Sequence, residues 1–217
     1  MARAAAVLSR IGVDGTSVVT DPMRVAVFVG TDHHPFDRLV STIDSWVDTV
    51  GVETEVMIQH GTSAPPAHAY GRPLVGHDDV MRLMQEADVV ACHGGPATIA
   101  DARKTGHRPL VMPRDPKRGE HVDSHQMLFA TRLARAGLIE LAQDEEALLA
   151  SLNAALRDSR RTTRHVHSLP EVPLGGQEIQ ANVAKIGRLA DALLDSAPPR
   201  RQAVLSALGF LREPSNA

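Results

Sequence analysis

A glycine pair that follows an apolar run is the part of this sequence best suited to bind an anion. Residues 88–92 predict a buried strand, and His93, Gly94 and Gly95 follow it before Pro96, Ala97 and Thr98 open a helix. Glycine leaves no Cβ between a ligand and the backbone N–H groups. A helix start adds unpaired N–H groups and partial positive charge. The pattern predicts a phosphate-binding turn, although a purely structural strand-to-helix turn would use similar residues.

A second group of candidates follows an earlier apolar run, residues 24–29, which ends at Gly30 and Thr31. His33 and His34 come next, in front of a predicted helix. A neutral imidazole can accept a proton from a hydroxyl group near neutral pH. His33, His34 and Thr31 are therefore the candidate catalytic residues. The alternative is that these histidines are ordinary surface residues at a helix start.

Further candidates lie downstream of the glycine turn. Asp101 falls in the first turns of the predicted helix, where its carboxylate could bind a ligand or simply complement the helix dipole. A long polar loop, residues 114–123, begins with Arg114, and His125 and Gln126 follow it at the start of another predicted helix. Cations in this loop could meet a phosphate or a carboxylated sugar, or could be solvated. His125 and Gln126 could bind a ligand, or they could have only a structural role at the start of the helix.

The sequence does not predict a metal site. It contains 11 histidines, but no two lie four residues apart within one predicted helix, and no pair of cysteines is available. Cys92 and His93 are adjacent, which is a poor arrangement for two ligands of one ion. We expect Cys92 to be a small buried apolar residue.

Composition narrows the class of protein. The chain has 217 residues, 43% of them hydrophobic, 23% charged and 3% aromatic, with a net charge of −3. These values are ordinary for a globular protein with an aliphatic core, and the net charge argues against nucleic acid as a partner. The single cysteine excludes an internal disulfide. No apolar run approaches the roughly 18 residues that a membrane-spanning helix needs.

Strand and helix patterns alternate from residue 25 to residue 156, which predicts an α/β fold with an open, mostly parallel, doubly wound Rossmann-like sheet. The first helix should bury Leu39, Val40, Ile43, Trp46, Val47 and Val50, which follow helical spacing. The stretch between residues 59 and 77 is predicted as a loop, and a short amphipathic helix is predicted at 200–212. We expect this domain to span residues 23–157, with a linker at 158–176 and C-terminal helices within 177–217. Residues 1–22 show no clear periodicity and are expected to be a disordered or extraneous extension. Either Met1 or Met23 could be the true start.

The ordered motifs resemble a known family. They are Gly30-Thr31, Pro35-Phe36-Asp37-Arg38-Leu39, His93-Gly94-Gly95-Pro96-Ala97-Thr98-Ile99, Pro109-Leu110-Val111-Met112-Pro113-Arg114 and Gly119-Glu120-His121-Val122-Asp123-Ser124-His125-Gln126. Over about residues 24–156 the chain resembles the C-terminal, donor-binding half of GT-B glycosyltransferases related to MurG. It is most similar to the split, single-domain PssE type of exopolysaccharide synthesis and to the catalytic subunit of the eukaryotic dolichol-linked GlcNAc transferase.

The resemblance implies roles for these residues. Gly94, Gly95, Pro96, Ala97 and Thr98 would hold the diphosphate of a UDP-sugar. Gly30 and His93 are further candidates for binding the donor, and Gly30-Thr31 would lie in the loop that faces the partner half, where acceptor and donor meet. Asp101 falls where MurG-like enzymes place a longer Glu on the ribose hydroxyls. His125 and Gln126 would read the donor sugar, with Arg114 nearby. The donor is a substrate, and no cofactor is implied. GT-B enzymes commonly need no metal, and no Asp-x-Asp motif occurs here.

The resemblance also implies partners, because a complete GT-B enzyme has two halves and this chain carries one. We expect a membrane-anchored, acceptor-binding subunit, a lipid-linked acceptor, inversion at the sugar, and a cytoplasmic location at the inner face of the membrane. A non-catalytic nucleotide-sugar-binding or regulatory module is the alternative. An unrelated doubly wound enzyme is disfavoured because the Gly-x-Gly-x-x-Gly, Gly-x-x-x-x-Gly-Lys-Ser/Thr and Gly-x-Ser-x-Gly motifs are absent. The sugar, the acceptor and the oligomeric state are left open.

Overall fold

The protein is built around one open sheet of six parallel strands. The computed structural model describes residues 10–11, 17–18, 21–161 and 184–188. The strands are β3 (Met23–Phe28), β4 (Thr54–Gln59), β5 (Tyr70–Arg72), β6 (Val89–Cys92), β7 (Leu110–Val111) and β8 (Glu140–Leu141). They are ordered β5-β4-β3-β6-β7-β8, and every pair is parallel. The predicted doubly wound α/β fold is confirmed.

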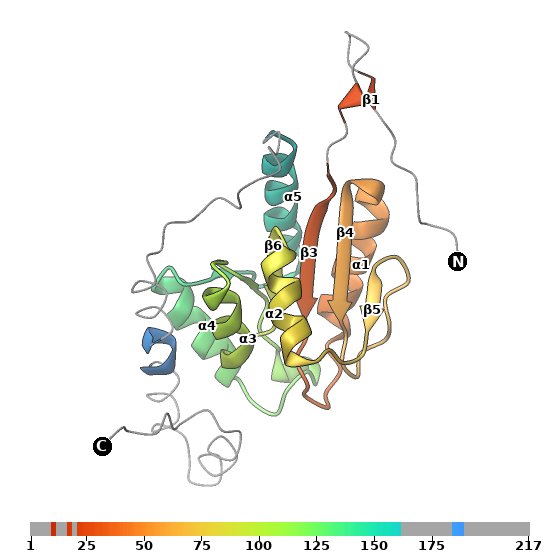
Figure 1. Cartoon of the computed structure of the whole chain (residues 1–217). Helices are drawn as coiled ribbons and strands as arrows, with labels where there is room; N and C mark the ends of the chain where they lie inside the picture. Colours follow the sequence, from red (N-terminus) through yellow and green to blue (C-terminus); the bar gives the residue numbers. More distant parts are fainter. Residues whose placement is uncertain (1–9, 12–16, 19–20, 162–183, 189–217) are drawn as a thin grey trace.

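Helices cover both faces of this sheet (Figure 1). They are α1 (Asp37–Val50), α2 (His77–Glu86), α3 (Pro96–Lys104), α4 (His125–Arg135) and α5 (Glu145–Arg161), with short 3-10 turns at Gly51–Glu53 and Pro116–Arg118. One core cluster joins α1 and α5 to residues such as Val25 and Val27, and a second joins α2, α3 and α4 to Ala26 and Phe28. Alternate residues of β3 thus supply the two clusters, as a strand buried on both faces requires.

The predicted apolar faces are largely confirmed. Leu39, Val40 and Ile43 of α1 are buried, as are Trp46 and Val47 about one turn after Ile43. Cys92 is fully buried, and burial raises the pKa of its thiol to about 12. It therefore serves as a core residue and stays protonated at neutral pH.

Three parts of the fold differ from the sequence-based expectation. The exposed edge strand β5 was predicted as loop, and β7 and β8 are shorter than the apolar runs that contain them. Helix α5 continues to Arg161, into the segment predicted as a linker from residue 158. Within the predicted C-terminal helices, residues 184–188 are helical and Ile186 is buried against α2–α4; the expected helix at 200–212 lies outside the described residues.

Most of the predicted N-terminal extension lies outside the described residues. Within it, β1 (Arg10–Ile11) pairs with β2 (Ser17–Val18) in an antiparallel bridge. Among the described residues, none of the helices is both long enough and apolar enough to span a lipid bilayer.

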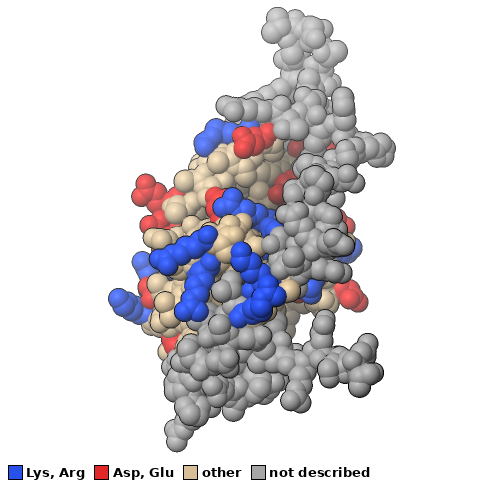
Figure 2. All heavy atoms as spheres, turned by 90° about the vertical axis from the view of Figure 1, so that its left-hand side faces the viewer, with Lys and Arg blue, Asp and Glu red and all other residues tan. Residues whose placement is uncertain are grey.

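The surface charge is uneven despite the small net charge. Figure 2 shows Lys and Arg side chains gathered on one face of the molecule. Lys104 is exposed at the last turn of α3, and Arg132 and Arg135 are exposed at the last turn of α4. Cations at these positions complement the negative ends of the helix dipoles.

A carboxylate on α1 holds the loop that leads into β5. Asp44 accepts hydrogen bonds from the backbone N–H groups of Ala67, His68 and Ala69 at 2.9, 2.8 and 2.8 Å. Burial works to raise the pKa of Asp44, but the three N–H donors and nearby His68 outweigh it and lower the pKa. The ionised form is therefore the one that stabilises the native loop.

Replacing Asp44 with asparagine is expected to cost about 2 kcal/mol of unfolding free energy at pH 7, because an amide cannot accept all three bonds. The pKa of Asp44 is lower in the native state than its unfolded value of about 3.9, so the ionised carboxylate stabilises the fold above that pH. This stabilisation is lost as the pH falls. The difference between wild type and Asp44→Asn should therefore shrink below about pH 4. Denaturant unfolding across pH measures it, with exposed Asp48→Asn as the control. A difference that is constant with pH would contradict this account.

Candidate functional site

The candidate site lies at the carboxyl ends of β3 and β6, two neighbouring strands whose following helices pack on opposite faces of the sheet. Strand β3 continues through α1 on one face, whereas its parallel neighbour β6 continues through α3 on the other. Loops at such a switch point open a crevice at the carboxyl ends of the strands, where doubly wound folds bind ligands. The loop at residues 30–36 follows β3, and residues 93–95 follow β6.

The ring of His93 lies between two of the predicted glycines. A Cβ on Gly30 would stand 2.6 Å from His93 Cε1, and one on Gly95 would stand 2.2 Å from Nε2. Gly30 also has a φ of +83°, a conformation that favours glycine. Its N–H donates to Gln59 Oε1, and its carbonyl accepts from Gln59 Nε2. Both glycines are thus required by the packing of the protein itself.

His93 is a neutral, buried residue. It is 9% exposed, and its Nδ1 lies 3.3 Å from the carbonyl oxygen of Phe28. Burial, with Arg114 nearby, lowers the pKa of His93 to about 4. The ring therefore acts as a fixed wall of the turn.

Acidification should destabilise the fold through His93. The unfolded chain takes up a proton below about pH 6.5, whereas the native ring resists protonation down to about pH 4, so stability falls across that window by up to about 3 kcal/mol. A His93→Gln variant is expected to lose this part of the pH dependence. NMR titration of the His93 ring checks the cause directly: a midpoint near 6.5 would contradict it.

Gly94 and the start of α3 face Gln126. A Cβ on Gly94 would stand 2.9 Å from Gln126 Cβ, and Gln126 Oε1 accepts from the backbone N–H of Arg114 at 3.4 Å. Helix α3 begins with Pro96 after Gly95, and no side chain caps it. The geometry of a helix start leaves the N–H groups of Ala97 and Thr98 without carbonyl partners inside α3. An anion at this turn would meet them and the Thr98 hydroxyl.

The loop after β3 contains an aspartate–histidine pair. Asp32 Oδ1 accepts from the backbone N–H of His34 at 2.8 Å and lies 2.6 Å from its ring Nδ1. Burial works to raise the pKa of Asp32, but the two bonds from His34 and the charges of Arg114 and His121 outweigh it and lower the pKa. An ionised Asp32 selects the His34 tautomer with a proton on Nδ1, which leaves Nε2 with the free lone pair.

The same arrangement recurs in front of α4. Asp123 Oδ1 accepts from the backbone N–H of His125 at 2.9 Å and lies 2.8 Å from its ring Nδ1. His121 connects the two pairs: its Nε2 lies 3.7 Å from Asp32 Oδ2, and its Nδ1 lies 3.7 Å from Asp123 Oδ1. Two loops far apart in sequence therefore present oriented imidazoles at one edge of the sheet. Thr31 is exposed beside the first pair.

Arg114 lies beneath the site. It is 1% exposed, and its guanidinium donates to the carbonyl oxygens of Val29, His34 and Glu120 at 2.8, 2.7 and 3.0 Å. Its Cζ also lies 4.9 Å from the ring centroid of Phe36. Arg114 therefore fixes the loops relative to one another. A direct contact with a ligand, as the resemblance implied, would require some of these bonds to break.

A buried ion pair holds the polar loop before α4. Arg38 Nε and Nη2 donate to Glu120 Oε1 and Oε2, each at 2.8 Å, and Glu120 Oε2 also accepts from the backbone N–H of Asp115 at 2.7 Å. The hydrogen bond to Glu120 raises the pKa of Arg38. A two-point pair of this kind fixes orientation as well as position, so it places His121 next to Asp32.

Asp101 lies apart from these groups. Its Oδ1 accepts from Lys104 Nζ at 3.0 Å, and its Oδ2 lies 3.8 Å from Nδ1 of His77 at the start of α2. The carboxylate is thus engaged within the protein, and its role toward a ribose stays a prediction.

Sequence reasoning missed Asp32, His121 and Asp123. One signal could have found two of them: the Asp-x-His spacing occurs at both Asp32–His34 and Asp123–His125, and an aspartate side chain often bonds the backbone two residues on. The position of His121 follows only from the tertiary fold.

Fold and site together define a doubly wound α/β domain with an uncapped helix start and oriented histidines at its switch point. Residues 24–169 match the glycosyltransferase family 28 C-terminal domain, and the chain belongs to this family. No curated protein matches it closely enough to be a relative. The general prediction of a donor-binding glycosyltransferase domain is thereby confirmed, whereas the finer likeness to the PssE type and the dolichol-pathway subunit stays a prediction.

Several solved glycosyltransferases are similar in structure. The glycosyltransferase of kitacinnamycin is 15% identical, with 80% of this chain and 40% of that chain covered and a TM-score of 0.48. MurG of Acinetobacter baumannii is 18% identical, with 77% and 50% covered and a TM-score of 0.46. SnogD of Streptomyces nogalater is 18% identical, with 79% and 44% covered and a TM-score of 0.44. This chain spans half or less of their length.

Proposed function

We propose that this chain is the donor-binding subunit of an inverting, metal-independent glycosyltransferase that moves a sugar from a UDP-sugar to a lipid-linked acceptor. The observation that carries the proposal is the uncapped start of α3 at the switch point between β3 and β6. The N–H groups of Ala97 and Thr98, with the Thr98 hydroxyl, bind the diphosphate there. Fixed donors of this kind also stabilise the charge that develops on a leaving diphosphate.

The donor sugar extends from this turn toward the oriented histidines. The Asp123–His125 pair and Gln126 begin α4 beside the glycine turn, and Gln126 both donates and accepts hydrogen bonds, as recognition of hydroxyl groups requires. Asp101 on α3 is the candidate for the ribose hydroxyls.

The acceptor hydroxyl approaches from the loop after β3. His34, oriented by Asp32, has its Nε2 lone pair available and is the proposed general base. The proton of the attacking hydroxyl passes to Nε2 as its oxygen bonds the anomeric carbon and the diphosphate departs. His33 and Thr31 stand beside it. A His34→Gln variant is expected to slow transfer while its affinity for UDP stays unchanged.

A partner subunit supplies the acceptor-binding half in this proposal, holding the assembly at the inner face of the membrane. This follows from the resemblance to a donor-binding half, since residues 24–169 match a family described as a C-terminal domain. The basic face in Figure 2 would also be attracted to anionic lipid headgroups.

Calorimetric titration of the purified chain tests the donor assignment. UDP, UDP-GlcNAc, UDP-glucose and UDP-glucuronate are compared, with ADP and NAD as controls. Saturable binding of the uridine nucleotides alone is expected, and the sugar that binds tightest identifies the donor. Binding without transfer in the presence of the co-expressed partner would favour the non-catalytic module instead.

A further inference from the structure

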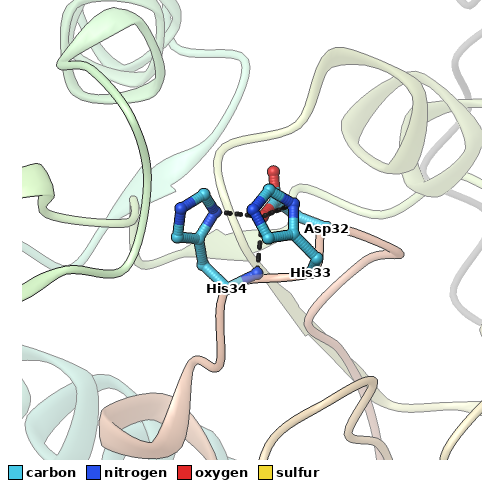
Figure 3. A group of neighbouring side chains, drawn as sticks. All are labelled: Asp32, His33 and His34. Carbon is cyan, nitrogen blue, oxygen red and sulfur yellow. Dashed lines mark hydrogen bonds and ion pairs between the residues drawn. The ribbon is translucent and has the colours of Figure 1, made fainter.

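The loop after β3 gathers three consecutive groups of the kinds that bind transition metals. Adjacent residues rarely share an ion, but the turn in which Asp32 accepts from the His34 N–H brings their ligand atoms together here. One ligand atom from each of Asp32, His33 and His34 lies within 4.8 Å of the others, and Figure 3 shows both imidazole rings next to the Asp32 carboxylate. The His33 side chain is 81% exposed, whereas those of His34 and Asp32 are 24% and 29% exposed. An ion could therefore enter from solvent without an opening of the fold.

A fourth group comes from the other loop of the site. His121 Nε2 lies 3.7 Å from Asp32 Oδ2, and its side chain is 18% exposed. The buried Arg38–Glu120 pair and the bonds from Arg114 to both loops hold this approach. The cluster thus joins residues almost 90 positions apart in the sequence, which the spacing of the histidines alone could not indicate.

We propose that Asp32, His33 and His34 form a zinc-binding site, and that His121 completes it by a movement of its side chain toward the ion. Zinc takes imidazole nitrogens and carboxylate oxygens in a tetrahedron with bonds of about 2.0–2.1 Å, so its ligands stand roughly 3.3–3.5 Å apart. The distance from Asp32 Oδ1 to His33 Nδ1, 3.7 Å, is close to that value. His121 Nε2 lies 3.7 Å from the other carboxylate oxygen, Oδ2, so it must come closer to share an ion bound at Oδ1. The 2.6 Å contact between Asp32 and His34 is a hydrogen bond that the ion would replace.

Binding requires one change of tautomer. His34 now donates from Nδ1 to Asp32; when Nδ1 binds the ion, the neutral ring carries its proton on Nε2 instead. Asp32 supplies one negative charge toward the ion. Arg114 is a fixed cation whose charge acts on Asp32. Its Nη1 and Nη2 donate to backbone carbonyls, so its charge weakens the site without blocking it.

The zinc site goes beyond the proposed function, because zinc bound there would inhibit the transfer of sugar. Transfer itself needs no metal in that proposal. Zinc on Nδ1 would leave the ring proton on Nε2, the atom that His34 is proposed to use as a base. This consequence alone rests on the proposed function: zinc-loaded protein is expected to bind UDP but to transfer sugar poorly.

Zinc titration of the untagged chain against a chromophoric chelator tests the site without any donor nucleotide. We expect one equivalent to bind, and His33→Ala and His34→Ala each to weaken it by about tenfold or more, with a smaller loss for His121→Ala. Cobalt substitution should give the visible absorption of a four-coordinate nitrogen and oxygen site.

Two controls separate this cluster from other histidines. His68→Ala removes an exposed histidine outside the cluster, whose Nδ1 lies 3.2 Å from Asp48 Oδ1, and a His165→Ala/His167→Ala double variant removes the pair outside the described residues. Both should bind zinc as wild type does. Binding that is lost with His165 and His167, or that survives His33→Ala and His121→Ala together, would overturn the proposal, whatever the result with UDP.

Discussion

The Gly95→Asp variant is expected to bind UDP about 100-fold more weakly than wild type. Gly95 is the residue immediately before α3, and aspartate at such a position accepts hydrogen bonds from the first N–H groups of its helix. The new carboxylate would therefore occupy the N–H groups of Ala97 and Thr98 and repel the diphosphate. Its Cβ would also displace the ring of His93, which stands 2.2 Å from that position. Calorimetry with UDP measures the loss.

Two matched variants separate these causes. Gly95→Ala introduces the same contact with His93 without a carboxylate, so it should weaken UDP binding by about tenfold or less. Gly76→Asp places the same carboxylate before α2, where the helix is likewise uncapped and a Cβ has open space; it should leave the affinity for UDP unchanged. If a folded Gly95→Asp protein bound UDP as wild type does, the diphosphate could not be bound at the start of α3.

Replacing Arg114 with methionine is expected to lower the unfolding free energy by about 4 kcal/mol. Methionine fills the space with an unbranched apolar side chain, but it leaves the carbonyl oxygens of Val29, His34 and Glu120 without their buried donor. Because these carbonyls belong to both loops of the site, UDP affinity should fall as well. Denaturant unfolding gives the first quantity and calorimetry the second.

An exposed arginine provides the comparison. Arg108 Nε donates to one carbonyl, that of Ile139, at 3.3 Å, and Arg108→Met should cost less than about 1 kcal/mol. Arg114→Lys keeps the charge but not the planar set of donors, and it should fall between wild type and Arg114→Met. A cost for Arg114→Met as small as that for Arg108→Met would show that the carbonyls do not depend on this side chain.

The parts of the fold that local patterns determine were predictable. The helical spacing of Leu39, Val40 and Ile43 marked the buried face of α1, and the change from an apolar run to Gly94 and Gly95 marked the start of α3. Strand β5 was not predictable in this way, because Tyr70 and Arg72 are exposed. Its formation depends on pairing with β4 and on the loop that Asp44 holds.

The loops that form the candidate site were predictable from the sequence, but the contacts between their side chains were not. Glycines at 30, 94 and 95 were attributed to close approach of a ligand, and the structure adds a second requirement, because His93 and Gln126 fill the space that side chains would need. Likewise, the sequence predicted that Arg114 is either solvated or in contact with a ligand. Its burial depends on carbonyls from residues 29 and 34, whose proximity no spacing along the chain reveals.

NMR spectra of the 15N-labelled chain, recorded as UDP is added, test the central claim most directly. The account predicts that the amide signals of Ala97 and Thr98 shift most and saturate together, with smaller shifts at Gly94 and Gly95 and none at the start of α2. Saturable shifts that map elsewhere, with Ala97 and Thr98 unchanged, would contradict the assignment of the start of α3 as the diphosphate site.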